Sequence, residues 1–234
     1  MTRLLEIEGL NAWYGASQVL HGVTLELDEG EVVVLAGRNG SGRSTLAKAV
    51  VGLVRKEGTV RFRGRSIEAL PTHTIARLGL GYVPEQRDVF PGLTVRENLI
   101  LGLKPGKSRS LPADVQRLFP VLRERAGVRA GALSGGEQQM LALARTLVGD
   151  PSLVIIDEPT EGLAPNVVVL VAGCLADLKA RGVAILLIEQ RASVARELAT
   201  RVAVMGRGRI VFDGSPEAFA ADTRVASEWL SVGG

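Results

Sequence analysis

The sequence contains few of the residues that mark secreted, membrane-spanning or metal-rich proteins. Its 234 residues include one cysteine, two histidines and only 4% aromatic residues. The single cysteine, Cys174, excludes an intramolecular disulfide, and we expect its thiol to be packed in a helix. No apolar run approaches the ~20 residues that a membrane-spanning helix needs. We therefore expect a soluble chain that meets a membrane only through a partner.

An excess of charge of one sign is also lacking. The chain has 28 Lys and Arg against 25 Asp and Glu, which gives a net charge of +3. These basic residues are scattered, with no basic platform that carries interleaved aromatic side chains, so we do not expect nucleic acid as a partner. His21 and His73 fall on no catalytic motif, and we expect both to be surface or structural residues.

What is abundant is apolar sequence, at 46% of the residues, arranged in short runs. These runs alternate with segments of helical spacing, which predicts an α/β fold with a mostly parallel sheet covered on both faces. The first runs instead predict antiparallel hairpins, which form an N-terminal antiparallel β subdomain at one edge. The expected strands are 4–7, 23–27, 32–36, 59–62, 81–83, 153–156, 184–188, 202–205 and 210–212, and the expected helices are 44–52, 134–148, 166–180 and 193–199.

The strand signals stop between residues 87 and 129. Prolines and a glycine break this stretch into short helical segments, which predicts a helical subdomain inserted into the core. We therefore predict a single domain over 1–234, with the α/β core formed by 1–86 and 130–234 and the inserted helical subdomain by 87–129.

The segment GRNGSGRST has the glycine spacing of a phosphate-binding loop between a buried strand and a helix. Its glycines let backbone N–H groups point at phosphate oxygens, and the helix adds its positive end. Ser44 is placed to bind Mg²⁺, but Arg43 stands where the pattern has lysine, and its planar guanidinium is not equivalent to an ammonium. The alternative is a glycine-rich turn without a ligand. The predicted nucleotide-binding residues are Gly37, Arg38, Asn39, Gly40, Ser41, Gly42, Arg43, Ser44 and Thr45.

The segment LVIIDEP is an apolar strand that ends in two carboxylates. Beside a phosphate loop, Asp157 is expected to hold Mg²⁺ through water and Glu158 to polarise the attacking water. Two adjacent acids at the end of a buried strand are costly unless a cation or water uses them. The alternative is a strand that simply leaves the sheet into an acidic turn. The pair predicts hydrolysis of the nucleotide in addition to binding.

The segment LSGGEQQ begins a predicted helix. Ser134 and Glu137 have the spacing of a capping box, which by itself explains a helix start. A capping box does not call for Gly135 and Gly136, which expose N–H groups at a helix N-terminus and so form a second anion site. Because one loop already binds the nucleotide, we expect this second site to face the nucleotide of another subunit in a sandwich dimer.

The three motifs, in this order and at this separation, resemble the ATP-binding subunit of ABC transporters over essentially the whole chain. The segments VPEQRDVFPGLTVRENL, LFPVLRER, EGLAPNVV and LLIEQRASVA are similar to the shorter ATPase subunit of branched-chain amino acid importers. The resemblance implies ATP and Mg²⁺ as cofactors, a second ABC ATPase subunit in a homo- or heterodimer, and two membrane permeases contacted by 87–129. It also implies an indirect extracytoplasmic binding protein and a peripheral location at the cytoplasmic face of the cell membrane.

The resemblance gives roles to residues outside the three motifs. Tyr14 looks like the aromatic that stacks on adenine, with a packed hairpin tyrosine as the alternative. Glu85 stands where most ABC ATPases have a glutamine that touches magnesium, Gln190 where they have the switch histidine, and Ala164 where they have an aspartate. These departures look normal for the branched-chain group. The implied catalytic residues are Glu158, Gln190 and Glu85, and the implied metal ligands are Ser44, Asp157 and Glu85.

The expected rate of ATP hydrolysis depends on where the Arg43 guanidinium lies. If its guanidinium misses the γ-phosphate, the loss of one transition-state donor costs ~3 kcal/mol, or roughly a hundredfold in rate. We therefore expect a subunit that binds ATP and hydrolyses it weakly beside a more active partner. The alternatives are a regulatory ABC ATPase outside transport, a catalytically silent binding subunit, and an importer of urea or amides, because ATPase subunits do not touch the transported substrate.

Overall fold

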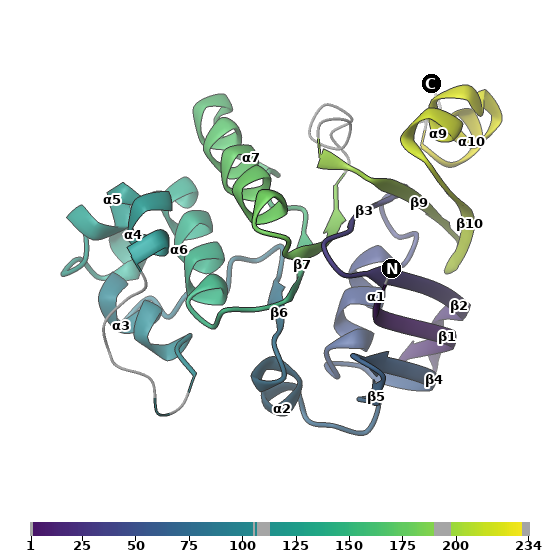
Figure 1. The fold of residues 1–234 in the computed structure, drawn as a ribbon, viewed down its shortest axis with the longest axis horizontal. Helices are drawn as coiled ribbons and strands as arrows, with labels where there is room; N and C mark the ends of the chain where they lie inside the picture. Colours follow the sequence, from purple (N-terminus) through teal and green to yellow (C-terminus); the bar gives the residue numbers. More distant parts are fainter. Residues whose placement is uncertain (1, 105, 107–112, 190–197, 231–234) are drawn as a thin grey trace.

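The computed structural model describes residues 2–104, 106, 113–189 and 198–230 (Figure 1). Ten strands form two sheets in this part of the chain. A four-stranded antiparallel sheet has the order β2-β1-β4-β5, with β1 Arg3–Tyr14, β2 Ser17–Asp28, β4 Arg55–Phe62 and β5 Arg65–Ser66. A six-stranded sheet has the order β10-β9-β3-β8-β7-β6, with β3 Val32–Ala36, β6 Leu80–Val83, β7 Leu153–Asp157, β8 Ala184–Ile188, β9 Arg201–Gly206 and β10 Arg209–Gly214.

The six-stranded sheet is parallel except for β10, which pairs with β9 in the antiparallel direction. Every residue of β7 and β8 is buried, which explains why these strands read as continuous apolar runs. Since parallel strands end at one common edge, the segments that follow β3, β6, β7 and β8 meet there. This edge therefore gathers the glycine loop, Glu85, the acidic pair and Glu189.

Alternate residues of the central strands face two separate hydrophobic cores. On β3, Val33 and Leu35 join one core while Val32 and Val34 join the other, as a period of two residues requires. The first core lies between the two sheets and includes the buried face of α1 Arg43–Val50, which contacts β1, β2, β4 and β7. The second core packs α6 Gly135–Leu147 and α7 Pro165–Ala180 onto the opposite face.

The segment between β6 and β7 is helical, and it lies on the side of the molecule away from the antiparallel sheet (Figure 1). An isolated bridge between Thr94 and Arg129 closes the base of this region. Thr94 also begins α3 with a capping box, in which its hydroxyl accepts from the backbone N–H of Glu97. The helices of the region are α3 Val95–Leu101, α4 Ala113–Leu118, α5 Pro120–Glu124 and the 3₁₀ turn η1 Ala130–Ala132, and α6 packs against α3 and α5.

All nine expected strands are present, and three of the four expected helices are found as α1, α6 and α7. The fourth, expected over 193–199, lies almost entirely outside the described residues. Three short helices were not predicted: α2 Thr72–Arg77, α9 Pro216–Ala221 and α10 Thr223–Trp229. No helix among the described residues is long and apolar enough to cross a membrane.

Candidate functional site

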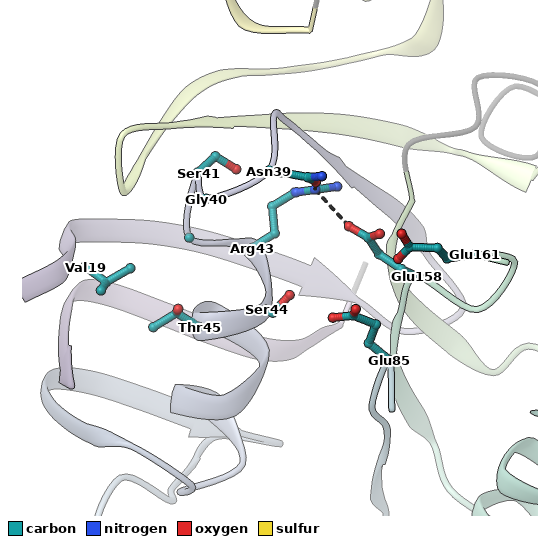
Figure 2. A pocket seen from close by; sticks show the side chains of 11 residues that line it. Val19, Asn39, Gly40, Ser41, Arg43, Ser44, Thr45, Glu85, Glu158 and Glu161 are labelled. Atoms are coloured by element: carbon teal, nitrogen blue, oxygen red, sulfur yellow. Dashed lines mark hydrogen bonds and ion pairs between the residues drawn. The ribbon is translucent and has the colours of Figure 1, made fainter. Parts of the chain in front are cut away.

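A cavity of about 440 Å³ lies at the edge of the parallel sheet where the strands end. It brings the glycine loop that follows β3 together with carboxylates that follow β6 and β7 (Figure 2). The lining residues are Val19, Asn39, Gly40, Ser41, Gly42, Arg43, Ser44, Thr45, Glu85, Glu158 and Glu161.

The backbone of the loop requires glycine at several positions. Gly40 and Gly42 have φ values of 79° and 107°, in the left-handed region that favours glycine. At Gly37, a Cβ atom would lie 2.5 Å from the backbone oxygen of Met205. The helix α1 that follows has Gly42 as its N-cap, with no side-chain cap and no acidic residue in its first turn. Its first N–H groups are therefore available to a ligand in the cavity.

Two buried polar atoms of the loop have no hydrogen-bond partner among the described residues. They are the hydroxyl oxygen of Ser41 and the Nη1 atom of Arg43. Buried polar groups are nearly always hydrogen-bonded, so these atoms can bind water or a polar ligand in the cavity. Hydrogen-bond donors, glycine backbone and a helix N-terminus together suit the oxygens of a polyphosphate. The residues present thus fit a nucleotide.

The guanidinium of Arg43 crosses the cavity to the residue after β7. Its Nη2 atom lies 2.8 Å from Oε1 of Glu158 and donates to Oδ1 of Asn39 at 3.2 Å (Figure 2). The side chains of Arg43 and Glu158 are only 4% and 11% exposed. The arginine that departs from the loop pattern is therefore paired with the predicted general base.

Ser44 and Asp157, two of the three residues predicted to hold Mg²⁺, are in direct contact. The Ser44 hydroxyl donates to Oδ1 of Asp157 at 3.1 Å, and Asp157 is 1% exposed. Burial raises the pKa of Asp157 to about 6, and the Ser44 hydroxyl and Arg43 partly oppose this rise. The described residues contain no group of three or more His, Cys, Asp or Glu that could hold a metal. Mg²⁺ would thus take part of its coordination from phosphate oxygens and water, as is usual for this ion, with Glu85 in the same cavity.

The turn after Asp157 holds Glu158 in an uncommon conformation. Glu158 has φ 46°, and its N–H donates to the backbone oxygen of Ile188 at 2.9 Å. A left-handed residue other than glycine costs of order 1–3 kcal/mol, and such strain is concentrated at functional sites. A second hydrogen bond joins the turn after β7 to the end of β8, because the Thr160 hydroxyl donates to Oε2 of the buried Glu189 at 2.8 Å.

Two cavity residues, Glu161 and Val19, were missed in the sequence. A hydrogen bond with Glu158 raises the pKa of Glu161, and the charge of Glu158 adds to this rise. Glu161 follows Glu158 by three residues, a spacing that a tight turn after the strand would have indicated. Val19 comes from β2, far from the loop in sequence, and no local pattern marks it.

The segment LSGGEQQ begins α6 with the predicted capping box. The N–H of Ser134 donates to Oε2 of Glu137 at 2.8 Å, and the N–H of Glu137 donates to the Ser134 hydroxyl at 3.3 Å. Both glycines have close neighbours: a Cβ at Gly135 would lie 2.7 Å from Nη1 of Arg87, and one at Gly136 would lie 2.9 Å from a methyl of Val167. None of the four motif residues lines the phosphate cavity of the same chain.

The other predicted site residues that the structure describes do not line the cavity. Gly37 and Arg38 belong to the loop but do not line the cavity, and Tyr14, at the end of β1, is 46% exposed and does not line it either. Ala164 is the exposed N-cap of α7. Gln190 lies outside the described residues.

A glycine loop between a parallel strand and a helix, with a serine–aspartate pair beside it, defines the class of P-loop nucleotide-binding ATPases. The family model described as "ABC transporter" matches residues 20–161. The chain therefore belongs to the ABC transporter ATPase family.

Individual relatives are similar to this chain over nearly its whole length. It is 39% identical to the high-affinity branched-chain amino acid transport ATP-binding protein BraG of Pseudomonas aeruginosa, over 97% of this chain and 99% of that protein. It is 34% identical to the probable branched-chain amino acid transport ATP-binding protein LivF of Archaeoglobus fulgidus, over 91% and 92%. A solved ATP-binding cassette of an ABC transporter in its ADP conformation is 25% identical, with a TM-score of 0.80 over 97% of this chain and 98% of that one.

Proposed function

We propose that this chain is the ATP-hydrolysing subunit of an importer for branched-chain amino acids, bound at the cytoplasmic face of the cell membrane. The observation that carries the proposal is the 39% identity to BraG over 97% of the chain, together with a cavity that holds Arg43, Ser44 and Glu158. The alternatives, a regulatory ABC ATPase or an importer of urea or amides, would use the same cavity and differ in their partners.

Each residue of the cavity has a role suited to its chemistry. The loop glycines and Thr45 would bind the phosphates of ATP, and Ser44, Asp157 and Glu85 would hold Mg²⁺. Bound Mg²⁺ supplies the positive charge that neutralises the phosphate oxygens during transfer. Glu158 would accept the proton of the attacking water, and the predicted partner in this step is Gln190. Tyr14 and Arg38 would meet the nucleotide at the rim.

A sandwich of two ATPase subunits would complete the site. Ser134 and the two glycines after it lie at the N-terminus of a 13-residue helix, yet they contribute nothing to the phosphate cavity of their own chain. The N–H groups of the two glycines and the Ser134 hydroxyl would instead meet the γ-phosphate held by a second ATPase subunit, with Glu137 fixing the helix start. In this arrangement the chain contributes to its partner's site even where its own hydrolysis is slow.

The helical insert, residues 87–129, would contact the permeases through an exposed aromatic ring. Phe90 is 50% exposed, and the fully buried Asn98 accepts from its N–H at 2.9 Å and donates to its carbonyl oxygen at 3.0 Å. The guanidinium of Arg145 lies 5.1 Å from the centre of the Phe90 ring. A fixed, exposed aromatic is a typical anchor of a protein interface. Leu101, at 56% exposure on α3, adds apolar surface to the insert.

The ion pair between Arg43 and Glu158 favours a subunit that hydrolyses ATP slowly. The ion pair between Arg43 and Glu158 occupies both the phosphate-binding cation and the proposed base in the nucleotide-free site. A second ATPase subunit with lysine at this position would then carry most of the turnover.

Co-expression tests the assignment. An importer subunit is expected to co-purify with two permeases and a second ATPase, and Phe90→Ala is expected to weaken that complex while nucleotide binding is retained. An exposed position away from the insert, Val211→Ala on β10, is the matched control. Isolation of the chain in a complex that contains no permease would contradict the proposal.

A further inference from the structure

The ion pair between Arg43 and Glu158 lies inside the space that the phosphates of a nucleotide would fill. Both side chains line the same cavity and are almost fully buried. Breaking a buried ion pair without a replacement leaves an uncompensated charge, which is strongly unfavourable. The pair therefore opens readily only when another anion takes the place of the Glu158 carboxylate.

Arginine is suited to this contact in a way that lysine is not. The Nη2 atom of Arg43 serves both Glu158 and Asn39, while Nη1 is buried and has no partner among the described residues. A lysine carries a single nitrogen on a shorter chain and offers no planar fork. The arginine thus reaches the residue after β7 from the start of α1 and still keeps one donor for a ligand.

A nucleotide would compete with Glu158 through its γ-phosphate. The basic residue at this position of a phosphate loop reaches the β- and γ-phosphates. The Nη1 atom of Arg43, which has no partner among the described residues, can meet the β-phosphate while Nη2 stays on Glu158. A γ-phosphate and the Glu158 carboxylate are both anions and would share one guanidinium, so they repel each other. ADP has no γ-phosphate and can bind with the ion pair intact.

We propose that Arg43 is a positioning and specificity-determining residue that holds Glu158 in the nucleotide-free and ADP-bound site and releases it only to a γ-phosphate. This inference rests on the proposed ATPase function of the cavity. It assigns the arginine a task beyond phosphate binding, since the side chain that recognises ATP also sets the general base free. After hydrolysis and loss of phosphate, the same ion pair forms again.

A double-mutant cycle on nucleotide affinity tests the inference without turnover. Wild type, Arg43→Lys, Glu158→Gln and the double variant would each be titrated with ADP and with a slowly hydrolysed ATP analogue, by calorimetry without Mg²⁺. With Arg43 present, we expect Glu158→Gln to tighten binding of the analogue by about tenfold and of ADP by less than about threefold. In the Arg43→Lys background, the gain for the analogue is expected to fall below about threefold.

The outcomes separate this inference from the proposed function. Equal gains in both arginine and lysine backgrounds, or equal gains for ADP and the analogue, would overturn the inference while leaving an ATP-binding subunit in place. A wild-type chain that binds neither nucleotide would overturn both.

Thermal unfolding of the four nucleotide-free proteins supplies a readout that needs no ligand. Glu158→Gln is expected to lower the Tm more when Arg43 is present than when lysine replaces it, and independent effects would contradict the contact. Glu158→Ala serves as the second variant if the glutamine form does not fold.

Discussion

Arg43 combines two chemical properties that the usual lysine of a phosphate loop does not have. Its guanidinium is planar and always charged, and it reaches Glu158 at 2.8 Å from the first residue of α1. The charge proposed for phosphate binding is kept, while the proposed base is held in an ion pair. This single residue would thereby allow nucleotide binding with slow turnover.

Arg43→Lys is expected to raise the ATPase rate of the chain by about tenfold or more, because a lysine frees Glu158 and presents a compact ammonium to the γ-phosphate. Steady-state phosphate release, measured alone and with the partner subunit, checks this. Arg61→Lys, at an exposed position of β4, is the control and should leave the rate unchanged. An unchanged or lower rate in Arg43→Lys would refute the idea that Arg43 limits hydrolysis.

Asp157→Asn is expected to stabilise the nucleotide-free, metal-free protein. The folded-state pKa of Asp157, about 6, lies above its ordinary value of 3.8, so the folded state binds the proton more tightly than the unfolded state. Stability is therefore lost as the pH rises through this window, and above it the ionised, buried carboxylate costs about 1–3 kcal/mol. The asparagine removes that cost but also the charge proposed to hold Mg²⁺.

Denaturant unfolding at several pH values checks this expectation. The variant should be more stable than wild type at pH 7.5, and the difference should shrink towards zero near pH 4. Glu8→Gln, an exposed carboxylate on β1, is the control. A variant that is less stable at pH 7.5 would show that the Asp157 carboxylate is not destabilising in the fold.

The helices α3 and α6 pack so closely that a side chain does not fit at Gly102, the residue that ends α3. A Cβ at Gly102, the C-cap of α3, would fall on the backbone oxygen of Arg145 in α6, at 1.9 Å. Gly102→Ala is expected to cost about 1–3 kcal/mol in the free energy of unfolding, because backbone must move.

Gly127→Ala is the matched control, since a Cβ there would meet nothing within 4 Å, and its effect should stay within about 0.5 kcal/mol. Urea denaturation of both variants compares them directly. Equal stability of the two would contradict the tight packing of α3 on α6.

The strands and the three motifs could be predicted because their signals are local. A buried parallel strand such as β7 is a run of apolar residues, and a capping box needs only Ser134 and Glu137. The short helices α2, α9 and α10, of six or seven residues, are below the length at which helical periodicity is readable. The contact of Arg43 with Glu158 depends on the distance between β3 and β7 segments far apart in sequence, which no local pattern contains.

For the molecule as a whole, the proposed sandwich needs a second copy of this chain or a partner ATPase. The phosphate cavity has the Arg43 guanidinium and three glutamates from its own chain, while the N-terminus of α6 does not line it. Glu158→Gln is expected to shift the ATP-bound chain towards a dimer with its ATPase partner, because hydrolysis no longer reopens the sandwich.

Light scattering with ATP, ADP and no nucleotide measures that shift. Ser134→Arg, in the Glu158→Gln background, should abolish the dimer by placing a bulky side chain where the γ-phosphate would bind. A dimer that forms equally well without nucleotide, or in the Ser134→Arg variant, would contradict the sandwich arrangement.

Uptake into vesicles would show whether this chain couples ATP to the import of branched-chain amino acids. Vesicles carrying the two permeases, both ATPase subunits and the binding protein would be supplied with labelled leucine and internal ATP. Uptake is expected to require ATP and to stop when this chain is omitted or when a non-hydrolysable analogue replaces ATP. Leucine uptake that continues without this chain, or a complete complex that does not take up leucine, would contradict the proposed function.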